Sequence, residues 1–308
     1  MTLLWVLAAL IAAAAQTARN ATQAHLTAAI GTTAATQVRF VFGLPFALVF
    51  LGGVTLAVGE VPPLPGAAAL LFTAIGAVAQ ILGTALMLVI MQKRSFAVTT
   101  AWLKTEPVMV ALFGAVVLGD HLGAGAVAAI AIATLGVVLL SVKPGAAALM
   151  LREAGPALSG IGAGALFGLA AIGFRGGILA LPDGGFLIRA STVLVLGLGM
   201  QVAMLLVWML AVNRRALAAS FTVWPQSLGA GFLGAFASQF WFIGFALTSA
   251  ANIRTLALVE VLMAQVVAWF AFRQGLTRRQ VAGMALILLG VAALLRLQAY
   301  WISASTPR

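Results

Sequence analysis

Two glutamates stand within long apolar stretches of the sequence, where an ionisable side chain is costly. Glu106 and Glu260 each lie near the centre of a hydrophobic run. A charged side chain at the middle of a bilayer costs at least about 2.5–3.5 kcal/mol and usually serves a function. A carboxylate at that depth can bind a cationic group or exchange a proton. Both glutamates are therefore candidate substrate-binding residues.

Other polar and aromatic residues are expected at a similar depth. On helical spacing Thr99, Trp102 and Glu106 share one face, while Lys104 points elsewhere. Gln80 and Gln239 lie near the middles of two further runs. Such a lining offers an aromatic plate, an acceptor and amide hydrogen bonds, which suits a zwitterion with a hydrophobic side chain. The predicted substrate-binding residues are Trp102, Glu106, Glu260, Gln80, Gln239, Arg39 and Arg189.

Each of these residues also has a structural interpretation. Lys104, Arg254 or another arginine would neutralise the two glutamates across a helix contact. The two glutamines would hydrogen-bond neighbouring helices together, and Trp102 would fill packing space. Arg39 and Arg189 lie near helix starts, where long basic side chains snorkel to the membrane surface. At the level of sequence these alternatives stay open.

The composition identifies the surroundings as lipid. Hydrophobic residues make up 63% of the 308 residues and charged residues 7%, against roughly 45–50% and about 25% in soluble domains. A soluble fold of this size could not cover its surface with so few charges. The composition therefore predicts a polytopic membrane protein whose partners include the lipid bilayer.

Long apolar runs predict ten transmembrane helices. They cover about 2–19, 33–58, 67–91, 95–118, 122–142, 156–180, 186–212, 226–248, 250–272 and 279–298. No Lys or Arg precedes the first run, which favours a retained span over a cleaved leader. Glycines are dense in the sixth run, around residues 160–164 and 173–177, where they permit close helix packing or bending.

The second half of the chain repeats the first. Residues from 95 onward align with residues from 249 onward, and small changes of offset extend the match upstream. The paired positions include Glu106 with Glu260, 135–137 with 289–291, Gln80 with Gln239, and Arg39 with Arg189. Five spans per repeat is an odd number, so the second repeat enters the membrane upside down. We predict an all-α integral membrane protein of two inverted five-helix repeats, residues 1–148 and 149–308.

The formal net charge of +11 arises from single and paired basic residues rather than from a patch interleaved with aromatics, so no nucleic-acid partner is expected. The basic loop residues all follow odd-numbered runs: Lys93, Arg94, Lys143, Arg152, Arg214, Arg215, Arg273, Arg278 and Arg279. The positive-inside rule then predicts that both termini face away from the cytoplasm.

The residue inventory argues against an enzyme. The chain has no cysteine, six carboxylates spread singly, and two histidines, His25 and His121, in predicted loops. We expect no catalytic residues, no metal and no cofactor. A G-x-x-x-x-G-K-[ST] phosphate loop is also missing from the sequence, so an ion gradient or the substrate's own gradient is the expected energy source.

A longer pattern runs from Ser95 to Val142. It contains Pro107 within the fourth run, Leu118-Gly119-Asp120 at its end, and Gly136 in the fifth run. In these features the chain resembles the ten-helix EamA-type members of the drug/metabolite transporter superfamily, which usually have L-G-E where 118–120 stand. In the second half Val261 replaces the proline, and residues 273–275 replace the L-G-E stretch.

This resemblance implies a secondary transporter, similar to the aromatic amino-acid exporters of that superfamily. Family members are usually drawn with both termini cytoplasmic, opposite to what the charges here predict. The expected function is export of small metabolites, with amino acids favoured, by alternating access between the repeats. Efflux of hydrophobic cations is the alternative, and a structural or signalling membrane protein is a remote one. Abundant Ala and Arg over Lys suggest a bacterial inner (plasma) membrane, and ten helices suggest a functional monomer.

Overall fold

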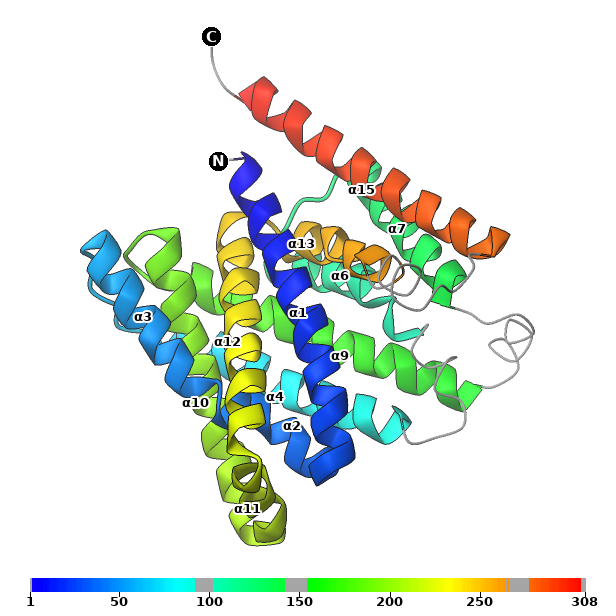
Figure 1. The fold of residues 1–308 in the computed structure, drawn as a ribbon. Coiled ribbons are helices and arrows are strands. Elements are labelled where there is room, and N and C mark those ends of the chain that lie inside the picture. The colour runs from blue at the N-terminus through cyan, green and yellow to red at the C-terminus, as the bar shows by residue number, and fades with distance from the viewer. Residues whose placement is uncertain (1, 92–101, 142–153, 264, 266–276, 306–308) are drawn as a thin grey trace. The chain divides into compact units, whose positions relative to one another are not determined.

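The part of the chain that the structure describes is mostly helical. The computed structural model describes residues 2–91, 102–141, 154–263, 265 and 277–305, and within them the backbone forms twelve helices and no strand (Figure 1). The helices are α1 (Thr2–Ile30), α2 (Thr32–Val41), α3 (Leu44–Val58), α4 (Ala67–Met91), α6 (Glu106–Val117), α7 (Ala124–Ser141), α9 (Ala154–Leu179), α10 (Phe186–Val212), α11 (Arg214–Thr222), α12 (Trp224–Leu247), α13 (Ala250–Leu256) and α15 (Arg278–Ser305).

Seven helical stretches are long and apolar enough to cross a membrane, which confirms the prediction of an all-helical membrane protein. They are Thr33–Val58, Ala67–Met87, Ala124–Ser141, Leu158–Leu179, Phe186–Val212, Trp224–Leu247 and Arg278–Gln298. Two shorter apolar helices are Leu3–Arg19 and Glu106–Val117. The predicted count of ten helices is therefore not confirmed over the described residues.

The twelve helices outnumber the ten predicted runs for two local reasons. The second predicted run is divided between α2 and α3 at Gly43, because Pro45 at the start of α3 has no N–H to donate to the preceding turn. The short helix α11 occupies a stretch that was expected to be a loop. Its first turn is capped by Asn213, whose side chain accepts a hydrogen bond from Ala216 N at 3.1 Å.

The helices form two compact units. The first comprises Met1–Leu10, Leu82–Ile172 and Ser249–Arg308, and the second comprises Ile11–Ile81 and Gly173–Thr248. Each unit draws on both halves of the sequence. The boundary between residues 148 and 149 thus refers to the sequence repeat, for which it stays a prediction.

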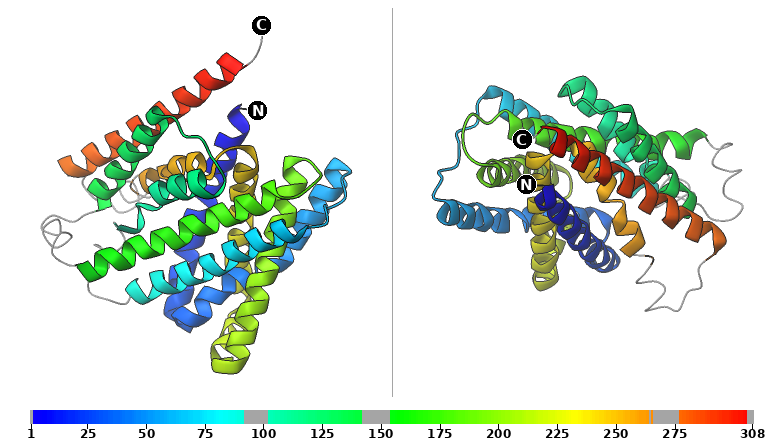
Figure 2. Two further views of the ribbon diagram at one scale, coloured as in Figure 1. Left: turned by 180° about the vertical axis from the view of Figure 1, so that it is seen from behind. Right: turned by 90° about the horizontal axis from the view of Figure 1, so that it is seen from above.

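In the first unit α7 and α15 run antiparallel side by side (Figure 2). They are the fifth and tenth predicted helices, and equivalent glycines bring their backbones together. A Cβ on Gly136 would lie 2.7 Å from Gly283 O and Ile287 N, and one on Gly290 would lie 2.6 Å from Ala129 O and Ala133 N. The repeat alignment pairs Ala129 with Gly283 and Ala133 with Ile287. The contact of Gly136 with α15 and the contact of Gly290 with α7 are therefore equivalent in the two repeats.

In the second unit α10 packs against α3 and α12, and α12 also packs against α2. The part of α9 in this unit approaches α4 closely. A Cβ on Gly173 would lie 2.6 Å from Gly76 N, and one on Gly176 would lie 2.6 Å from the Phe72 ring. The close-packing interpretation of the glycine-rich sixth run is therefore confirmed at these positions.

The glycine contact between α7 and α15 yields a test of stability. Gly136→Ala should lower the free energy of unfolding by about 1–3 kcal/mol, because the added methyl group meets backbone atoms that cannot rotate away. Thermal unfolding of the purified protein measures the effect. Gly199→Ala is the matched control, since nothing lies within 4 Å of a Cβ there and Ala favours a helix by up to about 1 kcal/mol. Equal melting temperatures for the two variants would contradict the packing account.

Candidate functional site

Glu106 lies where a helix is interrupted. Residues 102 and 103 are helical, 104 and 105 form a turn, and α6 begins at Glu106 with Pro107 in its first turn. Pro107 has no N–H for the Leu103 carbonyl, so the α-helical ladder cannot continue through this point. Tighter bonds replace it, from Thr105 N to Trp102 O at 3.1 Å and from Val108 N to Thr105 O at 3.0 Å. The Glu106 carboxylate consequently stands in the first turn of α6, where the helix dipole favours negative charge.

Glu260 lies at a corresponding interruption in the second half. The helix α13 ends at Leu256, residues 257 and 258 form a turn, and 259–263 are helical again. Here too the bonds shorten to three residues, as from Glu260 N to Ala257 O at 2.9 Å. The second half has Val261 in place of the proline. The interruption therefore does not depend on a proline at that position.

In the first unit, two ion pairs join the two interrupted segments. Lys104 Nζ donates a hydrogen bond to Glu260 Oε1 at 3.0 Å. Arg254 Nε lies 3.3 Å from Glu106 Oε1. Each half of the sequence thus supplies the cation for the glutamate of the other half, and α6 and α13 pack side by side (Figure 1). These contacts support the ion-pair interpretation of both glutamates.

The four side chains form a cluster with two positive and two negative charges. The exposed fractions of the four side chains lie between 15% and 26%, so each is mostly but not completely buried. Partial burial strengthens each pair relative to one in water, and an unpaired charge at this place would be costly. The cluster as a whole is electrically neutral.

Trp102 lies one turn before Glu106. Its carbonyl oxygen accepts a hydrogen bond from Thr105 Oγ1 at 2.7 Å. The indole Nε1 is buried and has no hydrogen-bond partner among the described residues, so a donor is available near the cluster. Thr99, which was expected on the same face, lies outside the described residues.

The packing of α9 over the α6 interruption is close. A Cβ on Gly164 would lie 3.2 Å from Leu103 O, and one on Gly168 would lie 3.3 Å from Val110 N. Glycine at these positions lets α9 contact the segment whose carbonyl Pro107 leaves without its usual partner.

Gln80 and Gln239 belong to the second unit and bridge helices there. Gln201 Nε2 donates to Gln80 Oε1, and Gln239 Nε2 donates to Ser191 Oγ, both at 2.8 Å. These bonds support the structural interpretation of the two glutamines. Gln239 Oε1 is nevertheless buried without a partner among the described residues. Gln201 was missed because it has no match in the repeat, although a glutamine in the middle of a long apolar run was itself a signal.

Arg39 and Arg189 stand at helix ends in the second unit. Arg39 lies in the last turn of α2, with its guanidinium carbon 4.5 Å from the centre of the Phe40 ring. Arg189 lies in the first turn of α10, beside the place where Glu60 Oε2 accepts a hydrogen bond from Gly185 N at 2.7 Å. These positions favour anchoring, and the structure does not bring either arginine into the four-charge cluster.

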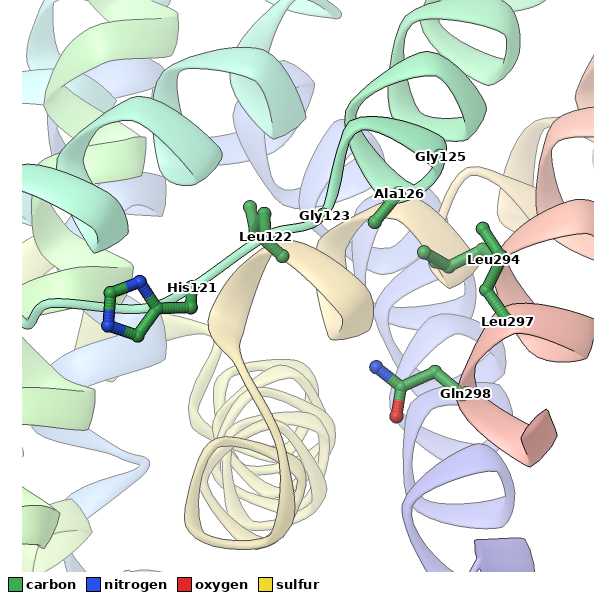
Figure 3. A pocket seen from close by; sticks show the side chains of 8 residues that line it. All are labelled: His121, Leu122, Gly123, Gly125, Ala126, Leu294, Leu297 and Gln298. Carbon is green, nitrogen blue, oxygen red and sulfur yellow. The ribbon is translucent and has the colours of Figure 1, made fainter. Parts of the chain in front are cut away.

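A separate cavity of about 470 Å³ lies between the start of α7 and the end of α15 (Figure 3). Its lining contains Leu122, Leu294 and Leu297, with His121 and Gln298 as the polar side chains. None of the seven predicted site residues lines it. The cavity offers no opposite charges, so the ion-pair cluster is the better candidate for recognition of a charged solute.

Several helices able to span a membrane, together with charged residues gathered at helix interruptions, are typical of a multi-pass membrane transporter. The chain belongs to the EamA-like transporter family, whose model matches residues 3–142 and again 158–296. Members of this family are transporters rather than enzymes, which implies a small-molecule substrate and a lipid bilayer as partners. The resemblance to the drug/metabolite transporter superfamily is thereby confirmed at family level.

One solved structure, described only as the crystal structure of a protein, has the same fold. It is 16% identical, with a TM-score of 0.67 over 96% of this chain and 97% of that chain. No curated protein matches the sequence.

The crossed pairing can be tested by double-mutant cycles on thermal stability. Lys104→Met and Glu260→Gln should show a coupling of about 0.5–3 kcal/mol, because either single change leaves the opposite charge without its partner. Arg254→Met with Glu106→Gln should show a smaller coupling, since that contact is longer.

Lys104→Met combined with Glu106→Gln is the control, because these two residues belong to the same half and are not paired. A coupling there as large as that between Lys104 and Glu260 would contradict the crossed arrangement.

Proposed function

We propose that the protein exports amino acids, aromatic or other hydrophobic ones in particular, by alternating access between its two repeats. The observation that carries this proposal is the neutral cluster of two cations and two carboxylates at paired helix interruptions. Interrupted helices near the middle of a membrane are where repeat transporters bind their substrates. A zwitterion has the charges that such a cluster can recognise.

The residues beside the cluster fit a hydrophobic amino acid. Trp102 offers an aromatic face for an apolar side chain, and its buried indole N–H can donate to a carboxylate. Gln239, in the second unit, stays a proposed contributor, since its buried Oε1 is a hydrogen-bond acceptor. Gln80, Arg39 and Arg189 stay proposed contributors with less support, because each has a structural role at its position.

The same geometry argues against hydrophobic cations as substrates. A cation site needs a carboxylate whose charge is available, as in an acidic aromatic pocket. Here Glu106 and Glu260 each face a cation, Arg254 and Lys104. A cationic ligand would have to displace a positive side chain without offering it a new partner.

The architecture that we propose is ten spans in two inverted repeats. The runs 2–19, 95–118 and 250–272 would complete the seven stretches already found, with α3 continuing α2 in the second span. The antiparallel packing of α7 on α15 supports the inversion, since these helices occupy equivalent places in the two repeats. We further propose a functional monomer in a bacterial inner membrane with both termini outside the cytoplasm, following the charge distribution.

Counterflow in proteoliposomes tests the substrate class. Purified protein is loaded with unlabelled phenylalanine, methionine or threonine, and uptake of the same labelled amino acid is followed. We expect transient accumulation with phenylalanine and methionine, and weaker accumulation with threonine. A larger apolar side chain makes more contact with the apolar face of Trp102. Trp102→Ala should raise the half-saturating phenylalanine concentration about three- to tenfold, as expected for a lost aromatic contact.

Trp208→Ala is the matched control, because Trp208 is 48% exposed on α10 and belongs to no candidate site. A folded protein in tight liposomes that accumulates none of the amino acids would contradict the assignment. Hydrophobic cations would then be the next solutes to test.

A further inference from the structure

The two ion pairs of the cluster differ in the length and alignment of their contacts. Lys104 donates an aligned hydrogen bond to Glu260, whereas the contact between Arg254 Nε and Glu106 Oε1 is 3.3 Å long and is not aligned as a hydrogen bond. The side chains of all four residues are partly exposed, by 15% to 26%, so it is the contact geometry that distinguishes the two pairs. The Arg254–Glu106 pair is therefore the one that a ligand can separate.

We propose that Glu106 and Arg254 neutralise each other only in the empty transporter, and that the substrate replaces both contacts when it binds. The substrate carboxylate binds the Arg254 guanidinium, and the substrate ammonium binds the Glu106 carboxylate. This inference rests on the proposed function, because it takes an amino acid as the substrate. It adds the assignment of one side chain to each charge of that substrate.

The other pair has a different role in this scheme. Lys104 and Glu260 stay paired through binding and hold the α6 interruption to the helical residues 259–263 that follow α13 while the first pair opens. They are positioning residues, since their charges are satisfied by each other in both states. The Arg254 guanidinium can present two N–H groups to a carboxylate, which makes it the better partner for the substrate than the Lys104 ammonium.

Charge balance then decides how the transporter cycles. The empty cluster is neutral because its charges cancel, and a zwitterion adds no net charge when it binds. The protein can therefore change between its two conformations with the site either empty or loaded, because neither state leaves an unpaired charge in the apolar interior of the bundle. An unpaired charge there would make that change too costly. The empty protein should therefore return without a second substrate, and membrane potential should not drive the loaded step.

The first experiment compares net efflux with exchange in wild-type proteoliposomes. Release of labelled phenylalanine into substrate-free buffer should be within about threefold of release into buffer with unlabelled phenylalanine, since the barriers for the empty and the loaded site are similar. A potassium diffusion potential imposed with valinomycin should leave both rates unchanged. Net efflux more than about tenfold slower than exchange, or rates that follow the potential, would overturn the inference.

The second experiment removes one charge from the ligand and one from the protein. Binding of phenylalanine, N-acetylphenylalanine and phenylalaninamide to the purified full-length protein is measured by calorimetry. Glu106→Gln should reduce the preference for phenylalanine over N-acetylphenylalanine by at least about tenfold, because the ammonium has lost its charged partner. Arg254→Gln should do the same to the preference over phenylalaninamide. Each variant should leave the other preference within about twofold.

The controls separate recognition from stability. Lys104→Gln and Glu260→Gln should lower the melting temperature yet keep both preferences, because they act on the pair that stays closed. The double variant Glu106→Gln with Arg254→Gln guards against misfolding, since it leaves no unpaired charge, and it should fold and lose both preferences. Equal loss of both preferences in all four single variants would overturn the assignment.

The two proposals fail in different ways. Wild-type protein that shows no counterflow with any amino acid would overturn both. Counterflow that is present while the Glu106 and Arg254 variants keep the wild-type preferences would overturn only the charge assignment, and the amino-acid transporter would stand.

Discussion

A charge inside an apolar bundle must have an opposite charge beside it, and this constraint shapes the centre of the first compact unit. Isolated carboxylates at Glu106 and Glu260 would be strongly unfavourable in such surroundings. Arg254 and Lys104 remove that penalty from the opposite half of the chain. Neither half is electrically complete alone, so the two must come together for the charges to be accommodated.

The helix interruptions allow these pairs to form. In a continuous helix Lys104 would point away from the face that Glu106 occupies. Lys104 stands instead in the turn at 104–105, where three-residue hydrogen bonds replace the α-helical ladder, and its side chain reaches Glu260. A feature that weakens the local helix therefore lets its charged side chain reach a distant partner, and close packing by Gly164 and Gly168 of α9 supports the interrupted segment.

The repeat appears in packing as well as in charge. Gly136 on α7 and Gly290 on α15 make equivalent approaches to the partner backbone, just as Glu106 and Glu260 make equivalent ion pairs. In lipid, where helices gain little from burying apolar surface against each other, such close backbone contact is a main source of association. This antiparallel contact holds α7 and α15 together.

The sequence by itself determined the membrane class, the repeat, the family and most helix positions, as α4 and α10 show by matching the predicted runs 67–91 and 186–212, because hydrophobicity and scarce polar residues are local properties. It also pointed to the charged and amide residues of interest. Only the tertiary structure decided which cation meets which glutamate and that Gln80 bonds to Gln201. Side-chain partners depend on helix direction and on contacts between residues more than 100 positions apart, which no local pattern contains.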